Sequence, residues 1–131
     1  MIKYFYSLSL LLIVLFFINS CDNNVDANEK EPADHFQIDL QTWFSNVKVK
    51  VSVDNSIVFD DTVTTGSILA YAAIIPVDIN KGTHSLKVTV DNSITKESTF
   101  SINDTLYVGV NYSAINSNIT FDFQNEPFPY R

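Results

Sequence analysis

The stretch that decides the fold is VKVKVSVDNSI, residues 47–57. Valines at 47, 49, 51 and 53 alternate with lysine and serine side chains, so an extended backbone would have one apolar face and one polar face. The residues that follow, Asp54-Asn55-Ser56, tolerate left-handed backbone and bond their own main chain. This pattern predicts a β-hairpin whose second strand lies near residues 57–64.

The same pattern of alternating apolar side chains and short polar turns recurs along the chain. Residues 50–57 and 87–94 read KVSVDNSI and KVTVDNSI, which match at seven of eight positions. We interpret them as two hairpins with the same turn chemistry, with an ancient duplication as the alternative. Further strands are predicted at residues 36–43, 67–75, 84–90, 96–102, 106–112 and 119–123.

The apolar run over residues 67–75 is the least regular of these segments. Three alanines leave a short helical turn as the alternative. The β-branched side chains of Ile74 and Ile75, followed by Pro76, favour a strand that ends at the proline.

Seven or eight short strands without helices between them predict an all-β fold. The spacing is typical of an antiparallel sandwich of the immunoglobulin or fibronectin type III kind, and a small β-barrel is the alternative. The phrase IPVDINKGTHSLKVTVD, residues 75–91, resembles the edge of bacterial immunoglobulin-like and PEGA-like modules. That resemblance implies a sandwich and carries no active site. Residues 36–131 suffice for one such domain.

The first twenty residues have the composition of a secretory signal peptide. Lys3 precedes the apolar run LSLLLIVLFFI, residues 8–18, which as a helix would rise roughly 16 Å, about half of a hydrocarbon core. Ile18-Asn19-Ser20-Cys21 resembles the lipobox of bacterial lipoproteins. The resemblance implies cleavage before Cys21, a diacylglycerol on its thiol and an acylated amino terminus. Together these acyl chains would anchor the protein stably in a membrane. An ordinary signal peptide cut near Ser20 is the alternative.

Residues 21–35 differ from the rest in composition. They carry many acidic and amide side chains, no aromatic residue and one branched aliphatic, Val25, so they bury too little to fold alone. We expect a flexible tether between the acylated Cys21 and a domain at residues 36–131. The resemblance implies the cell envelope, in the outer membrane of a Gram-negative bacterium. Asp22 resembles an inner-membrane retention signal of enteric lipoproteins, but in other bacteria acidic residues at this place act as export signals. The sequence therefore does not determine in which membrane leaflet the anchor lies.

The excess of acidic side chains limits the classes of partner that this chain is expected to bind. Fifteen acidic and eight basic side chains give a formal net charge of -7. Lys3 is the one charged side chain that cleavage before Cys21 would remove. Because nucleic-acid affinity comes from clustered lysines and arginines, no nucleic-acid partner is expected. An acidic domain is repelled by anionic headgroups, so membrane contact is expected through the lipid anchor.

Residues typical of catalysis or metal binding are sparse. Only His35 and His84 are residues of a type that could act as acid or base near neutral pH, and His84 shares the parity of Leu86, which indicates a partly buried imidazole. No serine lies in a glycine-flanked elbow, and glycines are too few for a phosphate cradle, so no cofactor is expected. One cysteine excludes a cysteine-based zinc site. No metal is expected either, because no D-x-D-x-D-G calcium loop joins the scattered candidate ligands Asp54, Asp60, Asp61, Asp78, Asp91 and Asp104.

Aromatic residues make up 13% of the chain and point to binding. Trp43, Tyr71, Tyr107 and Tyr130 are the candidates for outward-facing rings, which can stack on sugars, although packing at sheet edges is the alternative. The ending Pro127-Phe128-Pro129-Tyr130 cannot continue a central strand. We expect it either to lie against the sandwich or to serve as a docking tail.

Two short motifs indicate modification. Asp61-Thr62-Val63 and Asp104-Thr105-Leu106 resemble a signature on which some bacteria O-glycosylate extracytoplasmic proteins, which implies Thr62 and Thr105 as acceptors.

These observations predict a membrane-anchored envelope lipoprotein with a non-enzymatic β-sandwich that binds a glycan or protein ligand. The alternative is a structural accessory subunit of an envelope protein complex, docked through an open sheet edge or through the tail. A hydrolase that uses His84 is a third and weaker hypothesis.

Overall fold

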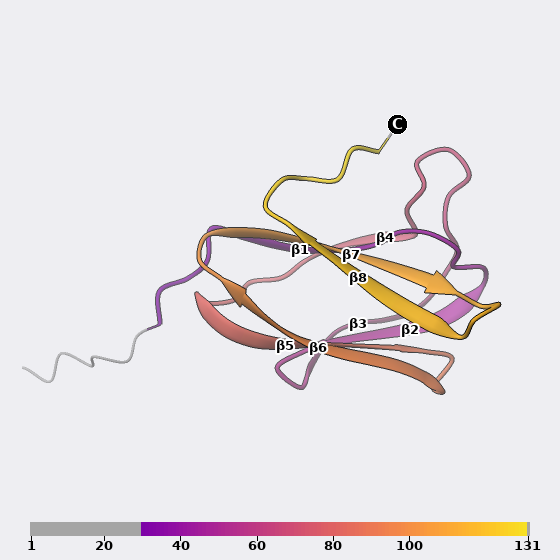
Figure 1. The fold of residues 1–131 in the computed structure, drawn as a ribbon, viewed down its shortest axis with the longest axis horizontal. Coiled ribbons are helices and arrows are strands. Elements are labelled where there is room, and N and C mark those ends of the chain that lie inside the picture. The colour runs from indigo at the N-terminus through magenta and orange to yellow at the C-terminus, as the bar shows by residue number, and fades with distance from the viewer. Residues whose placement is uncertain (1–29, 131) are drawn as a thin grey trace, which may run out of the picture.

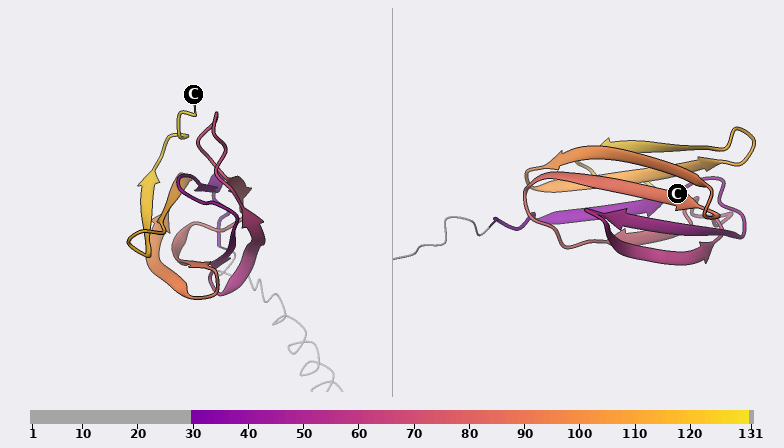
Figure 2. Two further views of the ribbon diagram at one scale, coloured as in Figure 1. Left: turned by 90° about the vertical axis from the view of Figure 1, so that its right-hand side faces the viewer. Right: turned by 90° about the horizontal axis from the view of Figure 1, so that it is seen from below.

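A computed structural model describes residues 30–130, and the predicted signal peptide and Cys21 lie outside this range. Eight strands make up its regular structure: β1 (His35–Leu40), β2 (Val47–Val53), β3 (Ser56–Val63), β4 (Ala73–Pro76), β5 (Gly82–Val90), β6 (Ile94–Ile102), β7 (Thr105–Ser113) and β8 (Asn118–Gln124). They form two stacked sheets, with strand orders β4-β1-β7-β8 and β3-β2-β5-β6 (Figures 1 and 2). The predicted all-β sandwich is confirmed.

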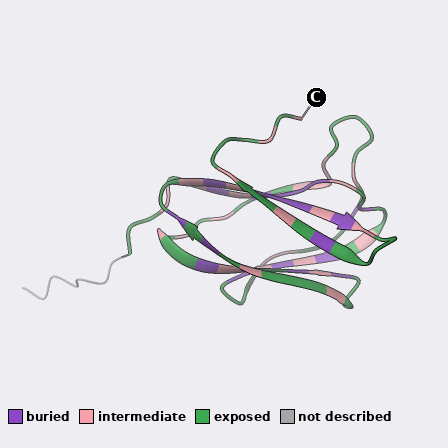
Figure 3. Ribbon diagram, in the orientation of Figure 1, coloured by how far each residue is buried: buried purple, intermediate pink, exposed green. Residues whose placement is uncertain are grey.

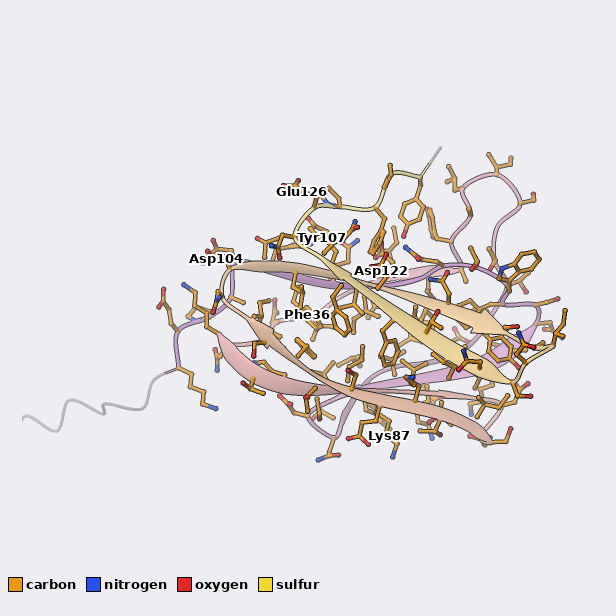
Figure 4. The ribbon with its side chains drawn as sticks, viewed as in Figure 1. Phe36, Lys87, Asp104, Tyr107, Asp122 and Glu126 are labelled. Atoms are coloured by element: carbon orange, nitrogen blue, oxygen red, sulfur yellow. The ribbon has the colours of Figure 1, made fainter. Side chains whose placement is uncertain are left out.

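The core lies between the two sheets, and alternation within the strands fills it. Val49, Val51 and Val53 of β2 point inward and are at most 4% exposed, whereas Lys48, Lys50 and Ser52 alternate with them on the outer face. Figure 3 shows this alternation along the strands. In Figure 4 Phe36 lies between the sheets, while Lys87 points away from the lower one. Burying the apolar face of each sheet against the other is the main stabilising contribution to such a fold.

The two DNS motifs close hairpins, as predicted. Asp54 and Asn55 have φ values of 49° and 65°, and Val53 pairs with Ser56, so the loop has two residues. Positive φ at both central positions defines a type I′ turn, whose twist matches that of the strands. The second motif also has positive φ at Asp91 and Asn92, but there Val90 pairs with Ile94. The same three residues therefore close loops of different length.

One strand pairing differs from the antiparallel pattern expected from the sequence. Of the six pairs, β1 with β7 is parallel, in the register Asp39↔Gly109, and the other five are antiparallel. The first residues of the two strands, His35 and Thr105, are paired, so both strands run from the same end of the sandwich. In the sheet β1 lies between β4 and β7. As a result β1 is an inner strand with neighbours on both sides.

The predicted strand over residues 67–75 is wrong over most of its length. Only Ala73–Pro76 forms a strand, and residues 64–72 form a projecting loop in which Ile68 is 80% exposed. The Gly66 N–H donates to Tyr71 O, which closes this loop on itself. Alanines have low strand propensity, and an apolar run does not by itself show that its side chains are buried. The opening strand likewise ends at Leu40, before Trp43.

The sandwich contacts begin at Glu31, ahead of the boundary at residue 36 expected from composition. Pro32 forms an isolated bridge with Asn80, and the Lys81 ammonium lies 2.8 Å from Glu31 and 3.4 Å from Asp104. The chain therefore enters the fold at the end that carries the β4–β5 and β6–β7 loops. No helix long and apolar enough to cross a membrane occurs within residues 30–130.

Candidate functional site

Four connecting loops gather at the end of the sandwich opposite the point where residue 30 enters (Figure 1). We call them the distal loops: residues 41–46, 64–72, 91–93 and 114–117. They expose large apolar side chains, namely Trp43 (76%), Ile68 (80%), Leu69 (45%) and Ile115 (96%). Exposed apolar side chains concentrated at one end of a domain are typical of an interaction surface.

The loop that carries Trp43 is tightly held. Phe44, the next residue, is buried at 2% exposure, and its N–H donates to Thr65 Oγ1 at 3.0 Å. The same hydroxyl donates to Gln41 O at 2.7 Å, and Thr65 N–H donates to Phe44 O. On the other side Thr42 Oγ1 donates to Asn111 Oδ1 at 2.6 Å. Trp43 is thus an exposed ring on a fixed loop.

The backbone of Trp43 is in a conformation that bulky residues rarely adopt. Its φ is 69°, in the left-handed region, where a side chain crowds the following carbonyl and costs roughly 1–2 kcal/mol. The 76% exposed ring gains little packing in return. Residues with a strained backbone are concentrated at functional sites.

Tyr71 and Tyr130, two other candidates, meet on the outer face of the β4-β1-β7-β8 sheet. Their ring centroids are 4.9 Å apart, tilted by 55°. The Tyr130 hydroxyl donates to Asp39 Oδ2 at 2.6 Å and accepts from Gln41 Nε2 at 3.2 Å. Asp39 Oδ1 accepts from Gln37 Nε2 at 2.8 Å. The C-terminal residues 126–130, which we call the tail, therefore lie against the sandwich.

Asp39 is the most deeply buried charged side chain described, with 0% exposure. No salt bridge within residues 30–130 involves it, and the Tyr130 hydroxyl supplies one of its two side-chain hydrogen bonds. Burial, and then the bond to Asp39, raise the pKa of Tyr130 well above its usual value. The phenol therefore stays a donor throughout the physiological range.

The pairing of β1 with β7 explains how the Gln41 side chain fits on this face of the sheet. Gly109 pairs with Asp39 across the sheet, and a Cβ at Gly109 would lie 2.6 Å from Gln41 Oε1. The Gln41 amide thus occupies the space that a side chain at Gly109 would fill. Asn111 Nδ2 donates a hydrogen bond to Gln41 Oε1 at 3.1 Å. No sequence motif marks Asp39, Gln41 or Asn111 as part of a binding site. Their alternation, with Asp39 and Gln41 two apart, is indistinguishable from an ordinary solvent face.

The fourth candidate, Tyr107, lies elsewhere on the same face. Its ring is 5.0 Å from that of His35 and half-buried. The structure therefore brings Tyr71 and Tyr130 together, places Tyr107 beside β1, and leaves Trp43 on a different distal loop from Tyr71.

His84 is buried at 9% exposure at the start of β5. Its Nδ1 lies 2.6 Å from Asp54 Oδ2, and its Nε2 lies 2.6 Å from Asn80 O. A carbonyl oxygen only accepts, so Nε2 carries a proton, and Nδ1 faces the Asp54 carboxylate. Both nitrogens are engaged in holding the β4–β5 loop against the β2–β3 turn.

The electrostatics of Asp54 fit this arrangement. Burial acts to raise its pKa, but hydrogen bonds from His84 and from the Ser85 N–H outweigh burial and hold the pKa below its usual value. A shallow pocket of about 280 Å³, lined in part by Ser56 and Val58, lies beside His84. A general base needs a free nitrogen within reach of a substrate proton, and neither nitrogen of His84 is free.

The remaining candidates are dispersed. Within residues 30–130 no three His, Cys, Asp or Glu side chains are close enough to hold a metal ion. Thr62 is exposed on β3, and Thr105 is half-buried at the start of β7. Cys21, the predicted lipidation site, lies outside the described residues.

Comparisons with known proteins give no further guide to function, since no family model matches this sequence and no curated protein shows significant similarity to it.

Proposed function

We propose that this chain is a lipid-anchored protein of the bacterial cell envelope, held by an acylated Cys21, whose β-sandwich is a non-enzymatic binding or adhesion module. The observation that carries the binding function is Trp43, a 76% exposed ring at φ 69° on a loop fixed by hydrogen bonds. The ligand is a glycan or a protein. An exposed aromatic ring suits both, because its apolar face stacks on a sugar and its large area anchors protein interfaces.

The position of Trp43 supports this function. The lipobox resemblance puts the anchor at the N-terminus, and the chain enters the sandwich at the end opposite the distal loops (Figure 1). We call the end that carries the β4–β5 and β6–β7 loops the near end. An N-terminal anchor would thus hold the near end toward the bilayer and present the distal loops away from it. The formal charge of -7 opposes close approach to anionic lipid.

Two substitutions separate the two ligand classes. Trp43→Gly removes the ring and should abolish binding to either ligand. Ile115→Ser, on the neighbouring β7–β8 loop, should weaken binding only to a protein, which would also cover the aliphatic side chains. Glycan arrays and purified envelope fractions are the probes, with Lys87→Ser on the opposite sheet as control. Unchanged binding by Trp43→Gly would contradict the proposed surface.

The anchor is tested independently. Growth with a tagged palmitate should label the wild-type protein, and Cys21→Ser should lose the label and leave the membrane fraction. Protease treatment of intact cells then distinguishes the two faces of the outer membrane. Digestion on whole cells would favour adhesion, whereas protection until the membrane is opened would indicate a periplasmic ligand.

A structural accessory subunit is the second candidate, and strand β8 favours it. This strand ends its sheet, so one backbone edge is open, and Phe123 on it is 37% exposed. Open edges accept an added strand from a partner. A stoichiometric partner that co-purifies with the wild type and is lost in Phe123→Lys, but not in Trp43→Gly, would support this function over the first.

A further inference from the structure

The tail packs on the sandwich in an unusual way. Residues 126–130 run from the end of β8 back over the outer face of the β4-β1-β7-β8 sheet (Figures 1 and 4). Within the described chain, no backbone–backbone hydrogen bond joins them to the body. Pro127 and Pro129 have no N–H to offer. The polar contacts to the body are a bond at the start of the tail, from Gln124 Nε2 of β8 to Glu126 O, and the two made by the Tyr130 hydroxyl, to Asp39 and Gln41.

The body, in contrast, has a preformed receptor for that side chain. Asp39 sits on an inner strand with its carboxylate oriented by Gln37, and Gln41 is oriented by Asn111. Tyr71 supplies an aromatic wall for the incoming ring. Apart from Tyr71, these groups lie on β1, β7 or the residue directly after β1, so the paired strands of the sheet position their backbone.

We infer that this face is a docking site for a proline-rich segment with a tyrosine, that the chain's own tail fills it in cis, and that the tail of a second copy can fill it in trans. The site is built on the sheet, while Tyr130 is the one side chain of its occupant that bonds to it, since the bond from Gln124 to Glu126 O lies outside the site, at the start of the tail. An occupant held in this way can be exchanged without unfolding either chain. Proline-rich segments suit such sites because they lose little conformational entropy on binding.

A second copy is the partner that this structure favours. The tail is the one segment whose fit to the site is visible, and every copy of the chain carries both tail and site. Short tethers give effective concentrations in the millimolar range, so the cis tail wins in dilute solution. Exchange between copies becomes competitive where the chains are crowded or where one tail is removed.

A peptide with the sequence of residues 125–131 tests the docking site. It should bind in a saturable manner to a chain that lacks residues 126–131, and roughly tenfold more weakly to the full chain, whose site is occupied. A peptide with phenylalanine in place of Tyr130 keeps the ring and loses the hydroxyl, so it should bind about tenfold more weakly to the truncated chain. If the truncated chain does not fold, the full chain with Tyr130→Phe replaces it and should admit the native peptide.

Two variants test the exchange between copies. The truncated chain has a free site and no tail, while Tyr71→Ala has a tail and a weakened site. Each alone should sediment as a monomer, and the mixture should form a heterodimer that the native peptide dissociates. The docking site would be refuted if the native peptide did not bind at millimolar concentration, or bound as tightly with phenylalanine. A mixture that stays monomeric while the peptide binds would overturn the second copy as partner.

Gln41 and Tyr71 of the docking site lie in distal loops, but neither experiment depends on the exposed ring of Trp43. Trp43→Gly should leave peptide binding unchanged, so failure of the ligand proposal and failure of the docking site give different results.

Discussion

The His84 imidazole and the Asp54 carboxylate, 30 positions apart in sequence, meet at 2.6 Å and join the start of β5 to the turn between β2 and β3. Asp54 also accepts from the Ser85 N–H at 2.9 Å, and the opposite ring nitrogen bonds to Asn80 O. A histidine and an aspartate in contact can suggest catalysis, but here both ring nitrogens already have partners. The pair acts as a clip between two loops at the near end of the sandwich.

Removing the clip should destabilise the fold. His84→Ala leaves Asn80 O without its donor and opens space beside Phe100, whose ring centroid is 5.7 Å away. We expect the free energy of unfolding to fall by about 2 kcal/mol, measured by urea denaturation. His35→Ala, a half-buried histidine on the outer face, is the matched control and should change it by less than about 1 kcal/mol. Equal losses would contradict the clip.

The clip also predicts a pH dependence. The folded-state pKa of Asp54 is lowered by His84 and Ser85, so in acid the unfolded chain binds more protons than the folded chain. The stabilisation is present above the unfolded pKa of roughly 3.9 and is lost as the pH falls through the lower folded value. Asp54→Asn should flatten this acid limb in denaturation curves recorded between neutral and acid pH. Asp122→Asn, at an exposed site, should retain the limb.

The tail contact gives a third prediction, through a glycine. In Gly109→Ala the new Cβ would displace the Gln41 amide, which then loses its bonds to Asn111 and Tyr130. We expect a loss of about 1–2 kcal/mol in stability and faster proteolysis of the tail. Gly66→Ala is the control, since its nearest neighbour, Tyr71 O, would be at an ordinary 3.4 Å. A slower loss of the tail in Gly109→Ala would be inconsistent with this network.

The β2–β3 turn gives a fourth prediction. Asn55 has φ 65° at the second central position of the turn, where glycine carries no steric cost. Asn55→Gly should be neutral or stabilise by up to about 1 kcal/mol, and Asn55→Val should destabilise by about 1–2 kcal/mol. Thermal unfolding of the two variants side by side measures the difference. A valine variant as stable as the glycine variant would exclude the assigned turn.

The strands were predictable because their physics is local. The valines of residues 47–53 alternate with polar side chains, and Asp54-Asn55 favours positive φ, so the hairpin follows from neighbours in sequence. The parallel pairing of β1 with β7 and the looped residues 64–72 were not predictable in this way. Both depend on contacts between distant segments, such as Asp39 with Gly109 and Phe44 with Thr65.

The sites show the same division. Trp43 could be singled out from the sequence because large aromatic residues are conspicuous, but its strained backbone could not. Asp39 looks like any outward-facing residue of an edge strand. Only the parallel placement of β7 and the return of Tyr130 from 91 positions away make it a buried carboxylate.

The strain at Trp43 leads to a fifth prediction. If the fold does not need this side chain, Trp43→Gly should relieve the left-handed backbone and raise the free energy of unfolding by about 1 kcal/mol, which corresponds to a rise of roughly 4–8 °C in Tm. Calorimetry on the two proteins checks this. A clear fall in Tm would mean that the ring stabilises the fold and is not kept for binding.

Trp43 is the chain's one tryptophan, so a fluorine label on tryptophan reports on the proposed surface alone. The most direct test is the ¹⁹F NMR spectrum of the 5-fluorotryptophan protein, titrated with purified envelope fractions and with soluble envelope glycans. The proposed function predicts that the single resonance shifts or broadens in a saturable way, and that Ile115→Ser reduces the effect if the ligand is a protein. A resonance that stays sharp and unmoved while the protein binds either probe would show that the ligand lies elsewhere and contradict the account.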